Sequence, residues 1–134
     1  MTAGYSGTPL PTKLGIKADS RVLLIAAPHG FLLGDIPPDA TVHTRRGREP
    51  YDVIVAFTPD ARALSMRFES LMTALTSAGG LWICWPKKAS GVQTDLGEGG
   101  VRAHGLDCGL VDVKIAAIDT TWSGIKFVRR LADR

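Results

Sequence analysis

Apolar and polar residues alternate in blocks through the middle of the chain, and these blocks predict a strand, a helix and a second strand. Residues 52–57 (DVIVAF) form an apolar run rich in β-branched side chains, typical of a parallel strand buried on both faces. Residues 81–85 (LWICW) form a second run of this kind. Between them, apolar residues at helical spacing make one stripe: Leu64, Phe68, Leu71, Met72 and Leu75. The stretch from Tyr51 to Pro86 therefore predicts one βαβ unit.

Residue types also predict where this helix begins and ends. Thr58 stands at an N-cap position, Pro59 at the first helical position, and Asp60 in the first turn, where free amides favour an acceptor. Gly79 and Gly80 are expected to supply the left-handed stop. We therefore expect a helix that starts at Pro59 and is complete before the second strand.

The segments before this unit extend it into an α/β domain. Residues 21–27 (RVLLIAA) predict another buried strand, preceded by a short turn or helix that ends at Gly15, and residues 41–44 predict a short edge strand. Residues 28–40 carry three prolines and two glycines, so the first crossover is expected to be abbreviated.

The segments after the unit predict a weak helix and two paired strands. Residues 95–106 have a capping-box start, Asp95 with Glu98, but contain several glycines. Residues 110–118 and 122–130 are separated by a connection short enough for a β-hairpin. We expect one three-layer α/β domain over residues 1–134, with a mostly parallel sheet of about six strands and this antiparallel hairpin at its end.

Composition narrows the class of protein. With 134 residues, 45% of them hydrophobic and 22% charged, the chain can bury a single core. It has no apolar stretch of roughly 20 residues, as a membrane span needs, and no secretory signal, so we expect a cytoplasmic protein without a membrane partner. Cys84 and Cys108 have no metal-ligand spacing and are expected to be reduced packing residues. The net charge of +3 is compatible with an anionic ligand. The basic residues are not interleaved with aromatic residues, so the sequence does not indicate a nucleic-acid-binding surface.

Three segments resemble the S-adenosylmethionine-dependent methyltransferases: LGIKADSRVLLIAAPHG, SAGGLWICWPK and GLVDVKIAAIDTTWSGIKFVRR. This resemblance implies their Rossmann-like fold. Two departures concern the cofactor. Residues 26–30 (AAPHG) stand where that family has a glycine-rich loop, and residues 44–46 (TRR) stand where it has an acidic residue for the ribose. The activity is therefore not carried over.

Three other segments resemble an uncharacterised family of small, mostly actinobacterial proteins, domain-of-unknown-function family 3052. They are GYSGTPLPTKLGIK, WPKKASGVQTDL and TWSGIKFV. This resemblance supports the fold and the small size of the domain, and it implies no catalytic residue and no cofactor.

Candidate ligand-binding residues follow the predicted strands, because open α/β sheets bind ligands beyond the carboxyl ends of their strands. His29 and Gly30 follow the first strand and Thr58 the third. His29 can serve as acid, base or ligand, or it is a plain loop histidine. After the fourth strand, side chains able to hold a phosphate or carboxylate, with help from the amide of Gly91, are Lys87, Lys88 and Ser90. A solvated loop is the alternative there.

The three tryptophans divide between core and surface. Trp82 and Trp85 alternate along a central strand and are expected in the core, whereas Trp122 is expected near the surface.

The sequence as a whole predicts a non-catalytic binding module for an anionic or nucleotide-like small molecule or a protein partner. The alternative is a trimmed methyltransferase-like enzyme. Catalytic residues, cofactor and oligomeric state stay open.

Overall fold

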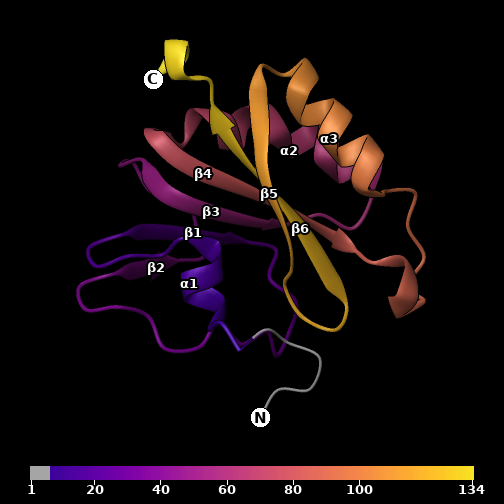
Figure 1. The fold of residues 1–134 in the computed structure, drawn as a ribbon, viewed down its shortest axis with the longest axis horizontal. Helices are drawn as coiled ribbons and strands as arrows, with labels where there is room; N and C mark the ends of the chain where they lie inside the picture. The colour runs from indigo at the N-terminus through magenta and orange to yellow at the C-terminus, as the bar shows by residue number, and fades with distance from the viewer. Residues whose placement is uncertain (1–6) are drawn as a thin grey trace.

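The computed structural model describes residues 7–134, so the first six residues of the predicted domain lie outside the described part of the chain. The described residues form a six-stranded mixed sheet with three α-helices (Figure 1). The strands are β1 (Arg21–Ile25), β2 (Thr41–His43), β3 (Tyr51–Phe57), β4 (Leu75–Pro86), β5 (Leu110–Ala117) and β6 (Trp122–Arg129). The helices are α1 (Leu10–Leu14), α2 (Ala61–Thr73) and α3 (Glu98–Asp107), with short 3-10 turns at Lys88–Ser90 and Leu131–Asp133.

The strand order in the sheet is β2-β1-β3-β4-β6-β5. The first four strands are parallel to one another, β6 runs antiparallel to β4, and β5 runs antiparallel to β6. Residues 26–40 contain no helix, which confirms the abbreviated first crossover. Along the chain, β2 is added on one side of β1 and β3 on the other side. The direction of the sheet's growth therefore reverses between β1 and β3.

Each face of the sheet has its own hydrophobic cluster. On one face, α2 and α3 bury Phe68 and Val101 against strand residues that include Trp85. On the other face, α1 buries Leu14 against a set that includes Trp82. The indole of Trp82 also donates a hydrogen bond of 3.0 Å to the Leu14 carbonyl, which ties α1 to β4. Both tryptophans are in the core, as predicted from their alternation.

The start of α2 differs from the prediction. Thr58 is buried rather than an N-cap, because its amide still donates to the Cys84 carbonyl across the sheet at 2.8 Å. The helix begins after Asp60, whose extended backbone and carboxylate, accepting from the Ala63 amide at 2.9 Å, make it the N-cap. Pro59 therefore lies outside the helix.

The predicted glycine stop of α2 is also wrong. The helix ends at Thr73, and both Gly79 and Gly80 lie inside β4 without positive φ. Between the pairs Tyr51 with Leu75 and Val53 with Gly80, β4 has three more residues than β3, so the strand carries a large irregularity there. Leu75, assigned by its spacing to the helical stripe, is buried from the strand instead.

The capping box predicted for α3 does not form. Asp95 accepts a hydrogen bond of 2.8 Å from the Ala61 amide and so helps to cap α2 rather than its own helix. The carboxylate of Glu98 pairs with Arg102 at 3.0 Å, and the N-cap of α3 is Gly97, which has no side chain to offer. The free amides of this helix start consequently have no side-chain cap.

Candidate functional site

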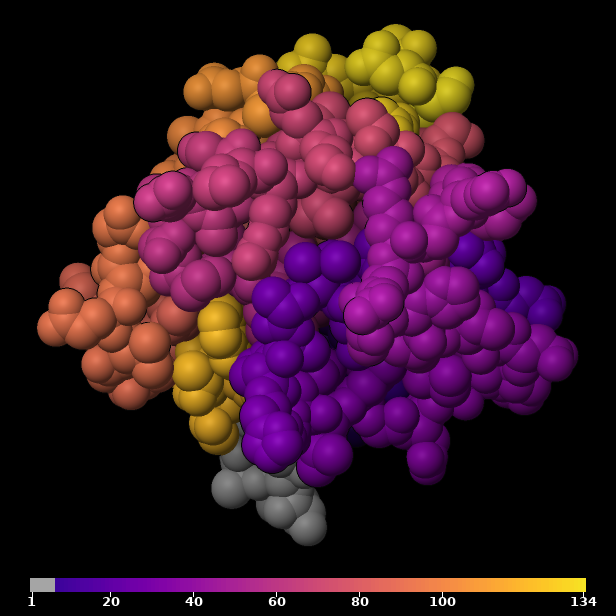
Figure 2. All heavy atoms as spheres, turned by 180° about the vertical axis from the view of Figure 1, so that it is seen from behind, coloured from indigo at the N-terminus to yellow at the C-terminus, as the bar shows by residue number. Residues whose placement is uncertain are grey.

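Open α/β sheets commonly bind ligands beyond the carboxyl ends of strands such as β1 and β3, and in this protein aromatic rings pack together there. The ring of Phe57, at the end of β3, lies between Phe31 and Trp122 with centroid distances of 4.8 and 5.2 Å. Seen from behind, the segment after β1 lies against the turn between β5 and β6 (Figure 2). Trp122 is half-buried by this packing, so the expected surface position holds only in part.

The loop after β1 holds two of the candidate residues. β1 ends at Ile25, earlier than predicted, because Ala26 takes the left-handed conformation with φ of 57°. His29 and Gly30 follow in an exposed stretch, and Gly30 has φ of 82°. Among the described residues, nothing holds the His29 ring by a hydrogen bond or an ion pair. This part of the candidate site is therefore an open loop without a placed acid–base partner.

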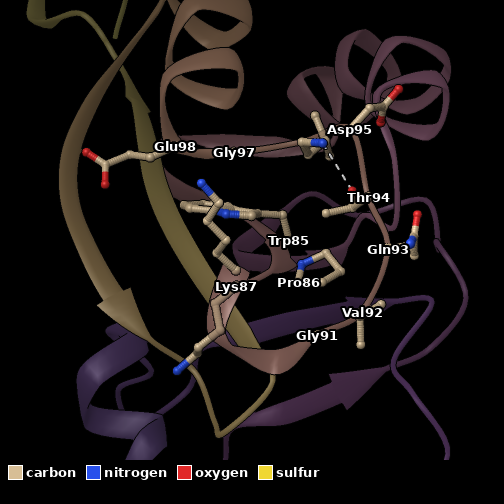
Figure 3. A pocket seen from close by; sticks show the side chains of 12 residues that line it. Trp85, Pro86, Lys87, Gly91, Val92, Gln93, Thr94, Asp95, Gly97 and Glu98 are labelled. Carbon is tan, nitrogen blue, oxygen red and sulfur yellow. Dashed lines mark hydrogen bonds between the residues drawn. The ribbon is translucent and has the colours of Figure 1, made fainter.

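A pocket of about 650 Å³ lies instead at the carboxyl end of β4 (Figure 3). Trp85 and Pro86 come from the end of the strand, Lys87 and Lys88 from the start of the 3-10 turn, and Gly97 and Glu98 from the start of α3. The intervening loop completes the lining with Gly91, Val92, Gln93, Thr94, Asp95 and Leu96. The pocket thus joins the end of a central strand to an uncapped helix start.

The lysines give one wall of this pocket its positive charge. Lys87 is half-buried and Lys88 is exposed. Neither forms an ion pair with a carboxylate in residues 7–134, where the ion pairs found are those of Arg102 with Glu98 and Asp112. The carboxylate of Glu98 points away from Trp85, consistent with its contact to Arg102 (Figure 3). Within residues 7–134, no carboxylate therefore neutralises either ammonium group.

Ser90 and Thr58 do not line the pocket. The Ser90 hydroxyl donates to the Lys87 carbonyl at 2.7 Å and accepts from the Val92 amide at 3.2 Å, so it shapes the lysine loop. The Thr58 hydroxyl donates to the Ala56 carbonyl at 3.1 Å in the core. Of the six predicted side chains and backbone positions, the structure brings Lys87 and Lys88 together in one pocket.

Two residues that position the pocket were not recognised as site residues. Thr94 donates a hydrogen bond of 2.7 Å to the Pro59 carbonyl and accepts one from the Leu96 amide, drawn as a dashed line in Figure 3. Asp95 binds the Ala61 amide. Together they fasten the pocket loop to the start of α2. The adjacent Thr and Asp before a glycine are a signal of local capping, but the sequence does not show which helix is capped.

Other chemistry is limited in the described part of the chain. Residues 7–134 contain no group of three or more His, Cys, Asp or Glu side chains that could hold a metal ion. Cys84 and Cys108 are free thiols, and burial raises the pKa of Cys84 far above its ordinary value. No helix in these residues is long and apolar enough to span a membrane.

Comparisons with known proteins support the fold. No protein-family model matches the chain, and no curated protein matches it by sequence. Among solved structures, the chain is similar to the crystal structure of an S-adenosylmethionine (SAM)-dependent methyltransferase from Aquifex aeolicus. The two share 13% identity with a TM-score of 0.58, over 87% of this chain and 85% of the other. The chain thus has a methyltransferase-like α/β fold, and at this identity the likeness concerns the fold alone.

Proposed function

We propose that this protein is a cytoplasmic, non-catalytic module that binds an anionic, nucleotide-like small molecule in the pocket at the end of β4. The observation that carries the proposal is the pair Lys87 and Lys88, unpaired within residues 7–134, on the wall of that pocket. Lysine binds phosphate as a point charge, and the uncapped amides at the start of α3 favour negative charge in the same place. A protein partner with an acidic side chain is the other occupant that this chemistry suits.

Within residues 7–134, the candidate acid–base and nucleophilic side chains do not lie together. His29 lies in an exposed loop outside the pocket lining, and Ser90 is engaged in its own loop. Acid–base or nucleophilic catalysis needs such groups within hydrogen-bond reach of one another. The resemblance of three sequence segments to the small actinobacterial family, for which no activity is implied, agrees with this proposal, and we infer membership of that family.

The alternative is a trimmed SAM-dependent methyltransferase-like enzyme, which the likeness in fold favours. Residues 26–30 and 44–46 weigh against it, because the sequence lacks both the glycine-rich loop and the acidic ribose partner there. The Phe31, Phe57 and Trp122 rings also occupy space beyond β3. We therefore expect weak binding of SAM at best.

Two measurements test the proposal. Mass spectrometry of small molecules retained after gentle purification should identify an anionic compound. Calorimetric titration with adenosine monophosphate should give measurable binding, whereas S-adenosylmethionine and S-adenosylhomocysteine should bind weakly. Sub-micromolar binding of either of the latter two would transfer support to the enzyme alternative.

A further inference from the structure

A second group of lysines lies at the opposite end of the sheet, on the α1 face. Lys126 of β6 is directly paired with Lys114 of β5, so two like charges stand opposite each other on neighbouring strands. Such pairs destabilise a sheet unless something neutralises them. Lys17, just after α1, is close enough to add to the repulsion on Lys126. None of these three ammonium groups forms an ion pair within residues 7–134.

The structure makes room for Lys126 rather than excluding it. A Cβ atom at Gly80 would lie 2.5 Å from Lys126 Cε. Because glycine has no side chain, the aliphatic part of Lys126 can cross β4 at this position. The ammonium reaches the end of α1, where a Cβ at Gly15 would lie 3.2 Å from Nζ. Lys114 donates to the Lys13 carbonyl at 3.1 Å, whereas no acceptor is found for Lys126 among the described residues.

Lys126 and Lys17 line a pocket of about 440 Å³ beside this cluster. The other walls come from the α1–β1 connection, the start of β3 and the irregular part of β4, including Asp19, Ser20, Asp52 and Gly80. The carboxylate of Asp52 is already engaged, because it accepts from the Arg21 amide at 2.8 Å. The volume suits a small molecule with one or two phosphate groups.

We propose that Lys17 and Lys126, beside the charge of Lys114, form a second anion site, which holds a phosphate group of a small molecule between the end of α1 and β6. Lys114 and Lys126 place like charges opposite each other, which is unfavourable for the sheet, and such locally unfavourable arrangements concentrate at functional positions. The cluster contains no arginine, so it offers point charges, which suit a tetrahedral phosphate, rather than the planar fork that suits a carboxylate. This site is independent of the pocket at the end of β4.

Protonation of Lys126 provides a direct signal of occupancy. In the free protein, burial and then the charges of Lys114 and Lys17 lower its pKa. Asp19 and Asp52 also line the pocket, and Lys13 lies near the same end of α1, donating to the Ala117 carbonyl. A phosphate beside Lys126 favours the charged ammonium, so binding should raise the pKa of Lys126. A lysine with a purely structural role would show no such change.

The test uses inorganic pyrophosphate as the probe, in the full chain carrying Lys87→Ala and Lys88→Ala so that the other pocket does not contribute. Calorimetry at low ionic strength should detect binding in this background. Adding Lys126→Met should weaken it roughly 10- to 100-fold, the effect of losing one charge-assisted contact. Carbon NMR of labelled lysine should show the pKa of Lys126 rising when pyrophosphate is present.

Lys17→Ala serves as a second variant, because Lys17 is exposed and its loss should leave the fold intact even if Lys126→Met does not fold. It should weaken binding at least severalfold, whereas Arg62→Ala, an exposed charge on α2 outside both pockets, should not when it is added to the same background. Absence of pyrophosphate binding in the background protein would overturn the proposal. Unchanged affinity in the Lys17→Ala variant, or an unchanged Lys126 pKa, would overturn it equally.

Discussion

The start of α2 depends on two carboxylates that come from different parts of the chain. Asp60 accepts from the Ala63 amide, and Asp95 accepts from the Ala61 amide across the pocket loop. A single-sequence reading assigns each aspartate to the helix that follows it. The structure shows that one cap is local and the other joins the pocket loop to the helix.

Replacing the local cap should therefore destabilise the protein in a way that depends on the side-chain oxygen. Asp60→Ala should lower the free energy of unfolding by about 0.5 to 2 kcal/mol, the usual loss when an N-cap acceptor is removed. Asp60→Asn keeps an oxygen at this position and should retain most of the stability. Urea denaturation of both variants measures the difference. Equal losses in the two would show that hydrogen bonding by this side chain is not what stabilises the helix start.

At the scale of elements, α2 packs on the sheet through its apolar stripe. Leu71 is 6% exposed and belongs to the cluster beneath α2 and α3. Leu71→Ala should cost about 2 to 5 kcal/mol of unfolding free energy, through lost burial and the cavity left behind. Met66, 72% exposed on the same helix, provides the control, since Met66→Ala should change stability by no more than about 0.5 kcal/mol. Matching denaturation midpoints for the two variants would contradict this packing.

The glycines of α3 have different structural consequences, although the sequence presents them as one group of helix-weakening residues. A Cβ at Gly105 would clash with the ring of Phe127, whereas one at Gly99 would meet nothing within 4 Å. Gly105→Ala should therefore cost about 1 to 3 kcal/mol by overpacking. Gly99→Ala should stabilise the protein by up to about 1 kcal/mol through helix propensity. Thermal and urea unfolding will give opposite signs for the pair if α3 packs closely on β6, and the same sign if it does not.

For the molecule as a whole, the pattern of apolar and polar positions was sufficient to predict the strands, and the prolines and glycines of residues 28–40 predicted the abbreviated crossover. Each block is a local feature, buried largely as a unit. The ends of helices and strands were not predictable where they depend on contacts with residues far away in the sequence. Thr58 resembles a helix cap by type, but its amide bonds to Cys84 in β4. Gly80 resembles a helix stop by type, but it lies in β4, where the side chain of Lys126 from β6 packs against it.

The candidate site was predictable to the same extent. Lys87 and Lys88 directly follow a central strand, so the topology alone places them at the carboxyl edge of the parallel strands, where open α/β sheets commonly bind ligands. The place of His29 and Ser90 depends on loop conformation, which the sequence does not specify. The contribution of α3 to the pocket arises because the loop after Lys88 folds back to the start of α2, through contacts such as that of Thr94 with Pro59.

The central claim is that the two lysines at the end of β4 hold an anionic, nucleotide-like ligand. Calorimetric titration of adenosine monophosphate into the parent protein and into the Lys87→Ala, Lys88→Ala double variant tests it most directly. The double variant should remain folded, because Lys87 is only half-buried and Lys88 is exposed. Its affinity should fall by about one to two orders of magnitude, the effect of losing a charge-assisted contact. Unchanged affinity in a folded double variant, or its unfolding, would contradict the account.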